Sequence, residues 1–320
     1  MPPVWQIRLK NTTGDLVTII EKWVRLRISP LVNSAGGYEL EFIDTGDGLP
    51  ELFELDSQLE FWRKNSDVGI GWRKEFEAFH IDSRRWVEQT GVHHFLSRGV
   101  GYTNLLARRI ILAAAGSPEG AKSGPAETVL KEYVYEQAGA GAGSRAISGL
   151  SVEVDGGGGN TIGIARSYQN LLSVCQEITA IGGGDFEVVG TAPAAFEFRW
   201  HDGQLGTDRR AEVTFSLAFG NMGEPEYIHT RSSEINAVLV AGQGEGEDRE
   251  LIWRTESDSI SDSPWNRREE LVDARDVEIG NVSLLNSRGD ARLKENRSTQ
   301  SLTFKVLQTP GMAYGREYFL

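Results

Sequence analysis

Histidine and cysteine are the residues with which this chain could hold a metal ion or activate a nucleophile. The five histidines are His80, His93, His94, His201 and His229. Because neighbouring residues on a strand point to opposite faces, His93 and His94 cannot grip one ion together. No HExxH or GxSxG motif occurs, and no histidine is evidently placed to activate Cys175. The sequence therefore predicts a protein that is not an enzyme and has no catalytic residue, metal or cofactor.

Paired carboxylates and glycine runs are the other patterns that can carry chemistry. Glu39 and Glu41 have the spacing of an acid–base pair on a strand, but an exposed strand face has the same spacing, and we expect the latter. The glycine runs at 138–144 and 154–163 match neither GxxxxGK[ST] nor a GxGxxG after a buried strand. The segment DGQLGTD lacks the ligand spacing of a calcium loop. We expect all three segments to be turns or flexible connections.

Charge and composition limit the possible partners. The 320 residues include 33 Lys and Arg against 46 Asp and Glu, which gives a net charge of −13. Sequence-independent nucleic-acid binding needs clustered cations, so the chain is not expected to bind DNA in this way. No apolar run reaches about 18 residues, and MPPVWQIRLK lacks the apolar stretch of a signal peptide. The sequence predicts a soluble protein made in a cytoplasm, without membrane insertion.

Hydrophobic periodicity divides the chain into three parts. Residues 4–95 alternate apolar and polar side chains between turn-rich segments, which is typical of antiparallel strands. From 102 to 183 the period becomes helical, and from 185 onward strand patterns return, including YGREYFL at 314–320. The expected class is α+β, mainly β. We expect a β domain at 1–100, a helical insertion at 101–190 and a C-terminal β-rich domain at 191–320.

Three helices are expected in the insertion. The first begins at Thr103 or Asn104 and carries an apolar stripe at helical spacing, formed by Leu105, Leu106, Ile110 and Ile111. The second is PAETVLKEYVYEQAG, in which Glu127 and Lys131 can pair at i,i+4. The third is IARSYQNLLSVCQEITAIGGG, which buries Cys175 on its apolar face and ends in glycines. WNRREELVDARD is either helical or an extended edge.

Three residues are candidates for contacts between subunits. Arg108 and Arg109 interrupt the apolar stripe, either as a solvated helix edge or as a fixed ion-pair or interface position. The chain has eight tryptophans, which fill cores or anchor interfaces. Trp265 lies in a polar loop beside Pro264 and Asn266, so it is the tryptophan that we most expect at an intersubunit contact.

A family resemblance extends over nearly the whole chain. It is carried, in order, by RLRISPLVNSAGGYELEFIDTG, WRKEFEAFHIDSRRWVEQTGVHHFLSRGVG, VTFSLAFGNMGEPEY, EINAVLVAGQGEGEDRELIW and WNRREELVDAR. Together these segments resemble the tail-hub (tail-tip, baseplate-hub-like) proteins of long-tailed siphophages. The resemblance implies two β-barrel-like tube modules in each chain, with the helical insertion between them. Three chains then present six modules, so that a homotrimeric ring joins the hexameric tail tube to a trimeric tip and fibre.

The resemblance also implies the protein's surroundings. The expected location is the tail tip of the virion, after assembly in the host cytoplasm. The expected partners are the distal tail protein ring, the tape-measure protein and a tail fibre or receptor-binding protein that attaches to the host. Viral DNA would pass through the ring without sequence-specific binding, and we hypothesise that acidic walls avoid trapping it. Alternatives are a tail component that hydrolyses cell-wall glycan through two carboxylates, or one that binds glycan on exposed tryptophans.

Overall fold

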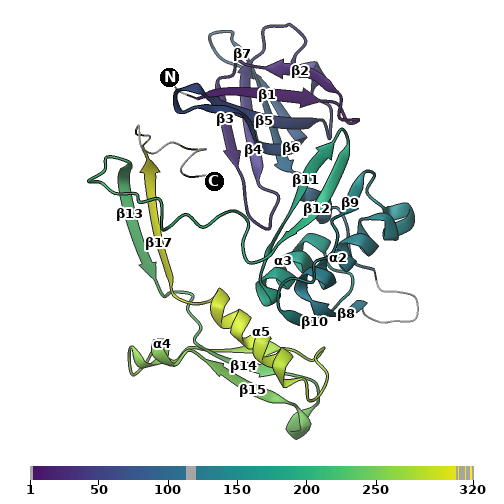
Figure 1. Ribbon diagram of the computed structural model, residues 1–320, viewed down its shortest axis with the longest axis vertical. Helices are drawn as coiled ribbons and strands as arrows, with labels where there is room; N and C mark the ends of the chain where they lie inside the picture. The colour runs from purple at the N-terminus through teal and green to yellow at the C-terminus, as the bar shows by residue number, and fades with distance from the viewer. Residues whose placement is uncertain (1–2, 113–119, 308, 310–313, 315–317, 319–320) are drawn as a thin grey trace.

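The computed structural model describes residues 3–112, 120–307, 309, 314 and 318. Figure 1 shows the N-terminal strands as one sheet that adjoins the helical region, with a long two-stranded ribbon and a small sheet further along the chain. Three separate hydrophobic clusters form the cores of these parts, and their members lie within 7–95, 79–200 and 238–293. The expected domain boundaries stay predictions.

The N-terminal region forms a seven-stranded antiparallel sheet in the order β2-β1-β5-β6-β7-β4-β3. Its strands are β1 (Val4–Lys10), β2 (Leu16–Ile20), β3 (Arg25–Ser29), β4 (Gly37–Ile43), β5 (Gln58–Asn65), β6 (Ile70–Val87) and β7 (His93–Gly101). Short 3₁₀ turns lie at Pro50–Leu52 and Ser66–Val68. Alternate residues of each strand face one core, as the period-two pattern predicts.

This sheet curls over its own apolar face. Strands β4 and β5 are separated by β6 and β7 in the sheet, yet the rings of Tyr38 on β4 and Phe61 on β5 have centroids 5.0 Å apart. Strands β2 and β3 lie at the two ends of the strand order, and no pairing joins them among the described residues. The mainly β, α+β class is confirmed, but the N-terminal module is an open, curled sheet and not a closed barrel.

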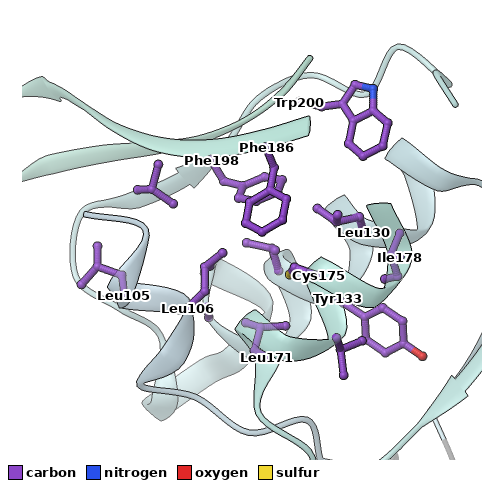
Figure 2. Packing of buried hydrophobic residues seen from close by; sticks show 14 of the residues in the cluster. Leu105, Leu106, Leu130, Tyr133, Leu171, Cys175, Ile178, Phe186, Phe198 and Trp200 are labelled. Carbon is purple, nitrogen blue, oxygen red and sulfur yellow. The ribbon is translucent and has the colours of Figure 1, made fainter. Parts of the chain in front are cut away.

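The helical region has two long helices beside short strands. Its elements are α1 (Asn104–Ala107), β8 (Gly120–Pro125), α2 (Ala126–Gln137), a 3₁₀ turn (Ala140–Arg145), β9 (Leu150–Val152), β10 (Thr161–Arg166), α3 (Leu171–Gly182), β11 (Asp185–Ala192) and β12 (Ala195–His201). Strands β8 and β10 pair, and the other three form a sheet in the order β11-β12-β9. Cys175 lies fully buried between these layers, near Phe186 and Phe198 in Figure 2. Its expected core position is confirmed.

The first expected helix is wrong in length, because its carbonyl groups bond to a distant segment. Helix α1 ends at Ala107, whose carbonyl accepts from Asn170 Nδ2 at 2.7 Å. The carbonyl of Arg109 accepts from the Leu171 amide at 3.0 Å, so it cannot continue the helical ladder. Ile110 consequently is 48 % exposed and does not extend the buried stripe.

The other two helices agree better with the sequence. In α2, Lys131 Nζ lies 2.6 Å from Glu127 Oε1, which confirms the expected pair. Helix α3 ends at Gly182, followed by Gly183 at φ 81°, a conformation that glycine adopts without strain. It begins only at Leu171, because residues 161–166 pair with β8 as a strand and the Asn170 side chain caps the first turn.

The C-terminal region is divided into a ribbon and a small domain. The ribbon pairs β13 (Met222–Thr230) with β17 (Thr299–Val306), two strands far apart in sequence that lie side by side in Figure 1. The small domain contains β14 (Ala237–Ala241), a 3₁₀ turn (Gly246–Asp248), β15 (Leu251–Thr255), α4 (Ser257–Ser261), β16 (Glu269–Asp273) and α5 (Val282–Glu295). Its sheet has the order β15-β14-β16, and α5 covers one face through Leu285 and Leu293.

This arrangement settles several expectations for the C-terminal region. The implied second tube module is no closed barrel within the described residues, since its strands belong to two separate sheets. Residues 211–217 (AEVTFSL), expected as one of the strands after 185, form neither strand nor helix, whereas 269–273 within WNRREELVDARD is extended. The strand expected at 314–320 lies outside the described residues, except for Tyr314 and Tyr318. Within the described part of the chain, no helix has the length and apolar character needed to cross a bilayer.

Side chains fix the N-terminal sheet to the helical region. Strand β11 is an edge strand, and three of its backbone amides donate to side-chain oxygens from elsewhere in the chain. Phe186 N donates to Asn33 Oδ1 at 2.7 Å, Val188 N to Thr103 Oγ1 at 3.2 Å, and Gly190 N to Glu77 Oε2 at 3.1 Å. These bonds cover an edge that would otherwise be free to pair with another strand.

Candidate assembly surfaces

Trp265 is a strongly exposed side chain. It is 87 % exposed in the loop between α4 and β16, and its backbone amide donates to Ser263 Oγ at 3.3 Å. An indole left in water at this exposure is suited to a contact with another molecule. Its role between subunits stays a prediction.

The two expected arginines have defined partners within the chain. Arg108 forms a two-pronged ion pair with Asp56, at 2.7 Å to Oδ1 and 3.0 Å to Oδ2, and its guanidinium lies over the Phe79 ring. Arg109 donates to the carbonyl of Arg145 at 2.8 Å. Burial lowers the pKa of Arg109, as do the charges of Arg145 and Arg108. Arg108 is thus held in an ion pair with Asp56. Intersubunit roles for both arginines stay predictions.

The ribbon leaves an apolar face open. On β17, Leu302, Phe304 and Val306 alternate with polar residues, so one face is apolar. Opposite Leu302 on this face lies Tyr227, and these two side chains are 53 % and 61 % exposed. Phe215 covers Phe304 at a centroid distance of 5.1 Å. Because two-stranded ribbons are marginal alone in water, the open part of this face is a candidate contact surface.

The outer face of the β14–β16 sheet is also apolar and open. Leu239, Trp253 and Leu271 lie in register across the three strands, on the face opposite α5. Trp253 is 45 % exposed and Leu271 is 58 % exposed, although the Arg267 guanidinium lies over the Trp253 ring. Neighbouring exposed apolar side chains of this kind are typical of protein contact sites.

The outer face of the N-terminal sheet, in contrast, is a ladder of alternating charge. Arg27, Glu39, Arg98 and Asp82 stand side by side on four adjacent strands, β3, β4, β7 and β6. Arg98 Nε lies 3.1 Å from Glu39. Glu41 lies 3.3 Å from Arg25 Nη2 and 3.0 Å from His94 Nδ1. Glu39 and Glu41 are therefore ion-paired with cations, as befits a polar strand face.

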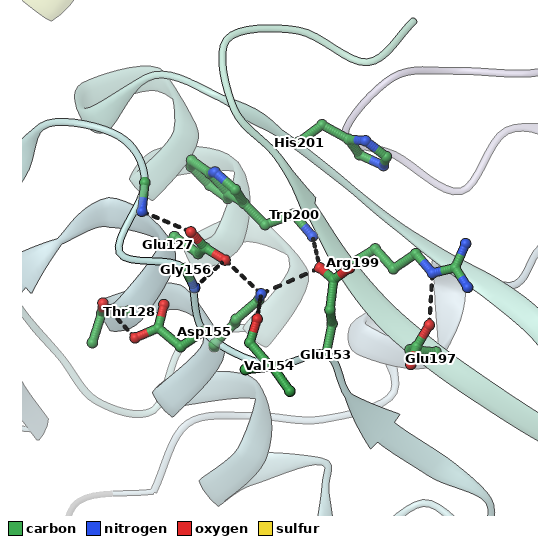
Figure 3. A network of polar contacts seen from close by, with 12 residues as sticks. Glu127, Thr128, Glu153, Val154, Asp155, Gly156, Glu197, Arg199, Trp200 and His201 are labelled. Carbon is green, nitrogen blue, oxygen red and sulfur yellow. Dashed lines mark hydrogen bonds and ion pairs between the residues drawn. The ribbon is translucent and has the colours of Figure 1, made fainter.

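The glycine run at 154–163 encloses a carboxylate of the chain itself. Figure 3 shows Glu127 at the loop, where its oxygens accept from the amides of Gly156 at 3.0 Å and Gly158 at 2.7 Å. Burial opposes its ionisation, but hydrogen bonds from Lys131 and these amides hold the pKa of Glu127 below its usual value. A phosphate would meet this carboxylate, so the loop is structural.

Metal and nucleophile chemistry find little support in the described residues. No group of three or more His, Cys, Asp or Glu side chains within them could hold a metal ion. Burial raises the pKa of the Cys175 thiol well above its usual value, which disfavours the reactive thiolate.

Sequence reasoning missed a cleft at the open end of the curled N-terminal sheet. Its volume is about 480 Å³, and its walls include Trp5, Trp23, Arg63 and Glu75. Arg63 was the residue that could have indicated this cleft in the sequence. Leu59, Phe61 and Arg63 are alternate residues of β5, so the arginine shares the face that points to the apolar interior.

The architecture matches solved structures of phage tail proteins. A tail protein from Neisseria meningitidis MC58 is 12 % identical, with a TM-score of 0.56 over 96 % of this chain and 81 % of that one. Prophage tail protein gp18 from Listeria monocytogenes EGD-e is 11 % identical, with a TM-score of 0.55 over 96 % and 82 %. The prophage MuSo2 43 kDa tail protein from Shewanella oneidensis is 12 % identical, with a TM-score of 0.56 over 95 % and 83 %. The chain thus has the fold of phage tail proteins.

The family follows from the sequence of the whole chain. The model of the Siphovirus ReqiPepy6 Gp37-like protein family matches residues 5–320. The chain therefore belongs to this family, and the resemblance to siphophage tail proteins seen in its sequence is confirmed. None of the curated protein sequences compared with it matches. The chain is therefore a member of a siphovirus protein family and has the fold of phage tail proteins.

Proposed function

We propose that this chain is a structural component of a siphophage tail, namely the hub of the tail tip, where three copies form a ring. The observation that carries the proposal is the apolar face of the ribbon, which stays open in one chain although solved proteins of this fold are phage tail proteins. Repeating one contact around a threefold axis would cover this face in every copy.

In this proposal the ring joins the hexameric tail tube to the trimeric tip. The N-terminal sheet and the ribbon are the two strand-built units that each copy contributes, so three copies approximate sixfold symmetry. The distal tail protein ring and the tape-measure protein would contact one side of the ring, and a fibre or receptor-binding protein the other. The hub has no enzymatic role in this proposal.

Viral DNA would leave through the ring. The charge ladder on the N-terminal sheet supports this part of the proposal, because Glu39 and Asp82 accompany Arg98 on the same face. A wall of alternating charge binds a polyanion weakly, and a chain with a net charge of −13 repels it. A ring whose bore is lined mainly by Arg and Lys would contradict it.

The oligomeric state tests the proposed function. Native mass spectrometry and negative-stain images of the purified chain should show a threefold ring. Trp265→Ala should weaken the ring while leaving the far-ultraviolet circular dichroism unchanged, whereas Tyr135→Ala, at a 51 % exposed position on α2, should leave it intact. A chain that stays monomeric alone and with the other tail proteins would contradict the proposal.

A second candidate function is glycan binding. The observation that favours it is the exposure of two indoles, Trp265 and Trp253, on one small domain. Exposed tryptophan rings can stack on sugars, and this role could accompany the hub. A glycan array probed with the chain and with Trp265→Ala tests it, since saccharide binding should fall in the variant.

A further inference from the structure

The cleft at the open end of the N-terminal sheet has the properties of a built recognition site. With Tyr314 and Tyr318 among its walls, the cleft keeps an open volume of about 480 Å³, in the range of ligand sites, which are mostly apolar with a few convergent polar groups. Trp5 comes from β1 and Leu26 and Ile28 from β3, so two ends of the curled sheet form its walls.

Arg63 and Glu75 are the polar groups of this cleft. Both side chains are nearly enclosed, at 4 % and 9 % exposure, and Arg63 Nε lies 3.2 Å from Glu75 Oε1. Burying an ion pair is costly unless further hydrogen bonds satisfy the remaining donors and acceptors. The pair therefore calls for a third group that can both accept from Arg63 and donate to Glu75.

A β-bulge aims Glu75 at this position. Phe61 on β5 lies opposite Phe76 on β6, and the next residue of β5, Trp62, lies opposite Lys74. No residue of β5 therefore lies opposite Glu75 in the strand pairing. An extra residue of this kind turns its side chain relative to the regular alternation, and bulges are frequent beside functional sites.

Tyr314 supplies the missing group. Its carbonyl accepts from Arg63 Nη2 at 2.9 Å, and its hydroxyl donates to Glu75 Oε2 at 2.9 Å. The Arg63 guanidinium carbon also lies 3.8 Å from the centroid of the Tyr314 ring, a cation–π contact. The site thus contacts the carbonyl, the ring and the hydroxyl, and only tyrosine offers all three in this geometry.

We propose that the Arg63–Glu75 pair in the wall of this cleft is a recognition site for tyrosine in a peptide, and that Tyr314 of this chain is its ligand. Val306, at the end of β17, also lines the cleft, so the seated Tyr314 ties the ribbon to the N-terminal sheet. The two strand-built parts of the chain then form one surface. The binding itself does not depend on the ring proposed above.

Hydrogen exchange on the full chain tests the tie. Tyr314→Ala should raise the exchange of residues 299–306 at least tenfold, Tyr314→Phe should raise it less, and Tyr135→Ala, on the exposed side of α2, should leave it unchanged. Exchange of the ribbon that is unaltered in Tyr314→Ala would overturn the proposal.

A synthetic peptide of residues 309–320 tests the recognition directly. It should bind the Tyr314→Ala chain saturably and change the tryptophan emission of Trp5 and Trp23. The same peptide with phenylalanine at position 314 should bind about tenfold more weakly, because the hydrogen bond to a carboxylate is lost. Equal binding of the two peptides would overturn tyrosine recognition.

A double-mutant cycle covers the case in which Tyr314→Ala fails to fold. Tyr314→Phe and Glu75→Gln, alone and together, should raise ribbon exchange non-additively if the hydroxyl and the carboxylate interact. Additive effects would overturn the clamp. A monomeric chain that still binds the peptide would refute the ring and leave this recognition site standing.

Discussion

The buried pair of Glu127 and Lys131 offers the sharpest test of the energetics. Glu127 accepts from Lys131 and from two amides of the glycine loop, and both side chains are less than 10 % exposed. Glu127→Gln keeps the shape and one carbonyl oxygen but removes the charge. We expect it to weaken the helical region, because the Lys131 ammonium would then be buried without its closest anion.

The size of the effect follows from the remaining contacts. Stripping a buried ion pair of one partner costs about 3–5 kcal/mol. Lys131 retains Glu153 at 3.3 Å and the Val154 carbonyl at 2.8 Å, so we expect the lower end, about 3 kcal/mol. At about 1.4 kcal/mol per tenfold, this raises exchange of the α2 amides roughly 100-fold.

Hydrogen exchange measured by mass spectrometry on α2 provides the assay. The matched control is Glu132→Gln, one turn along the same helix, where a 52 % exposed carboxylate pairs with Lys122. Exposed pairs contribute about 0–1 kcal/mol, so this variant should change exchange at most about fivefold. The reasoning is refuted if Glu127→Gln also stays within fivefold of the parent chain.

The pH dependence of the same variant has a definite sign. The pKa of Glu127 is lower in the folded chain than in the unfolded one, so its ionised form stabilises folding above the ordinary glutamate range. This contribution disappears as the pH falls through the lowered folded pKa. The difference between the parent chain and Glu127→Gln should therefore be full at neutral pH and shrink on acidification.

Three further variants test how the parts are positioned. Asn33→Gly keeps a conformation suited to φ 55° but removes the bonds to Phe186 and Asp185, so hydrogen exchange at β11 should rise about tenfold or more. Asn236→Ala leaves the Arg268 amide and the Asn266 carbonyl unpaired, and should cost about 2–4 kcal/mol in the urea transition of the small domain; a loss below 1 kcal/mol would contradict this. Gly184→Ala, at φ 77° and with an added Cβ that would clash with the Trp200 ring, should destabilise the helical region by at least about 2 kcal/mol, read from its thermal transition.

The sequence predicted those features that depend on local chemistry. Strand alternation at 4–95, the Glu127–Lys131 spacing and the glycines after α3 all describe short-range geometry, and the structure confirms them. Asn236 belongs to the same group, since an amide side chain at the start of a buried strand favours hydrogen bonds that hold a local turn. Its side chain indeed bonds Ser259 and the Arg268 amide.

Features that depend on distant partners could not be predicted. The apolar stripe after Thr103 fits a helix. However, the Asn170 side chain and the Leu171 amide donate to backbone carbonyls that a longer helix would need for its own hydrogen bonds. The Arg63–Glu75 pair requires a bulge and a tyrosine more than 230 residues away. No local pattern contains such information, because the competing contacts arise only when remote segments meet.

The ribbon shows a third case, in which the pattern describes contacts outside the chain. On β17, Leu302, Phe304 and Val306 alternate with Ser301, Thr303 and Lys305, which is typical of a strand with one buried face. The strand exists, yet Leu302 is 53 % exposed and its neighbour Tyr227 is 61 % exposed. Apolar alternation arises where a face is covered in the working state of a protein. In the proposed function that state is the assembled tail, so this face should become protected from exchange on assembly while the outer charge ladder at Arg98 stays accessible.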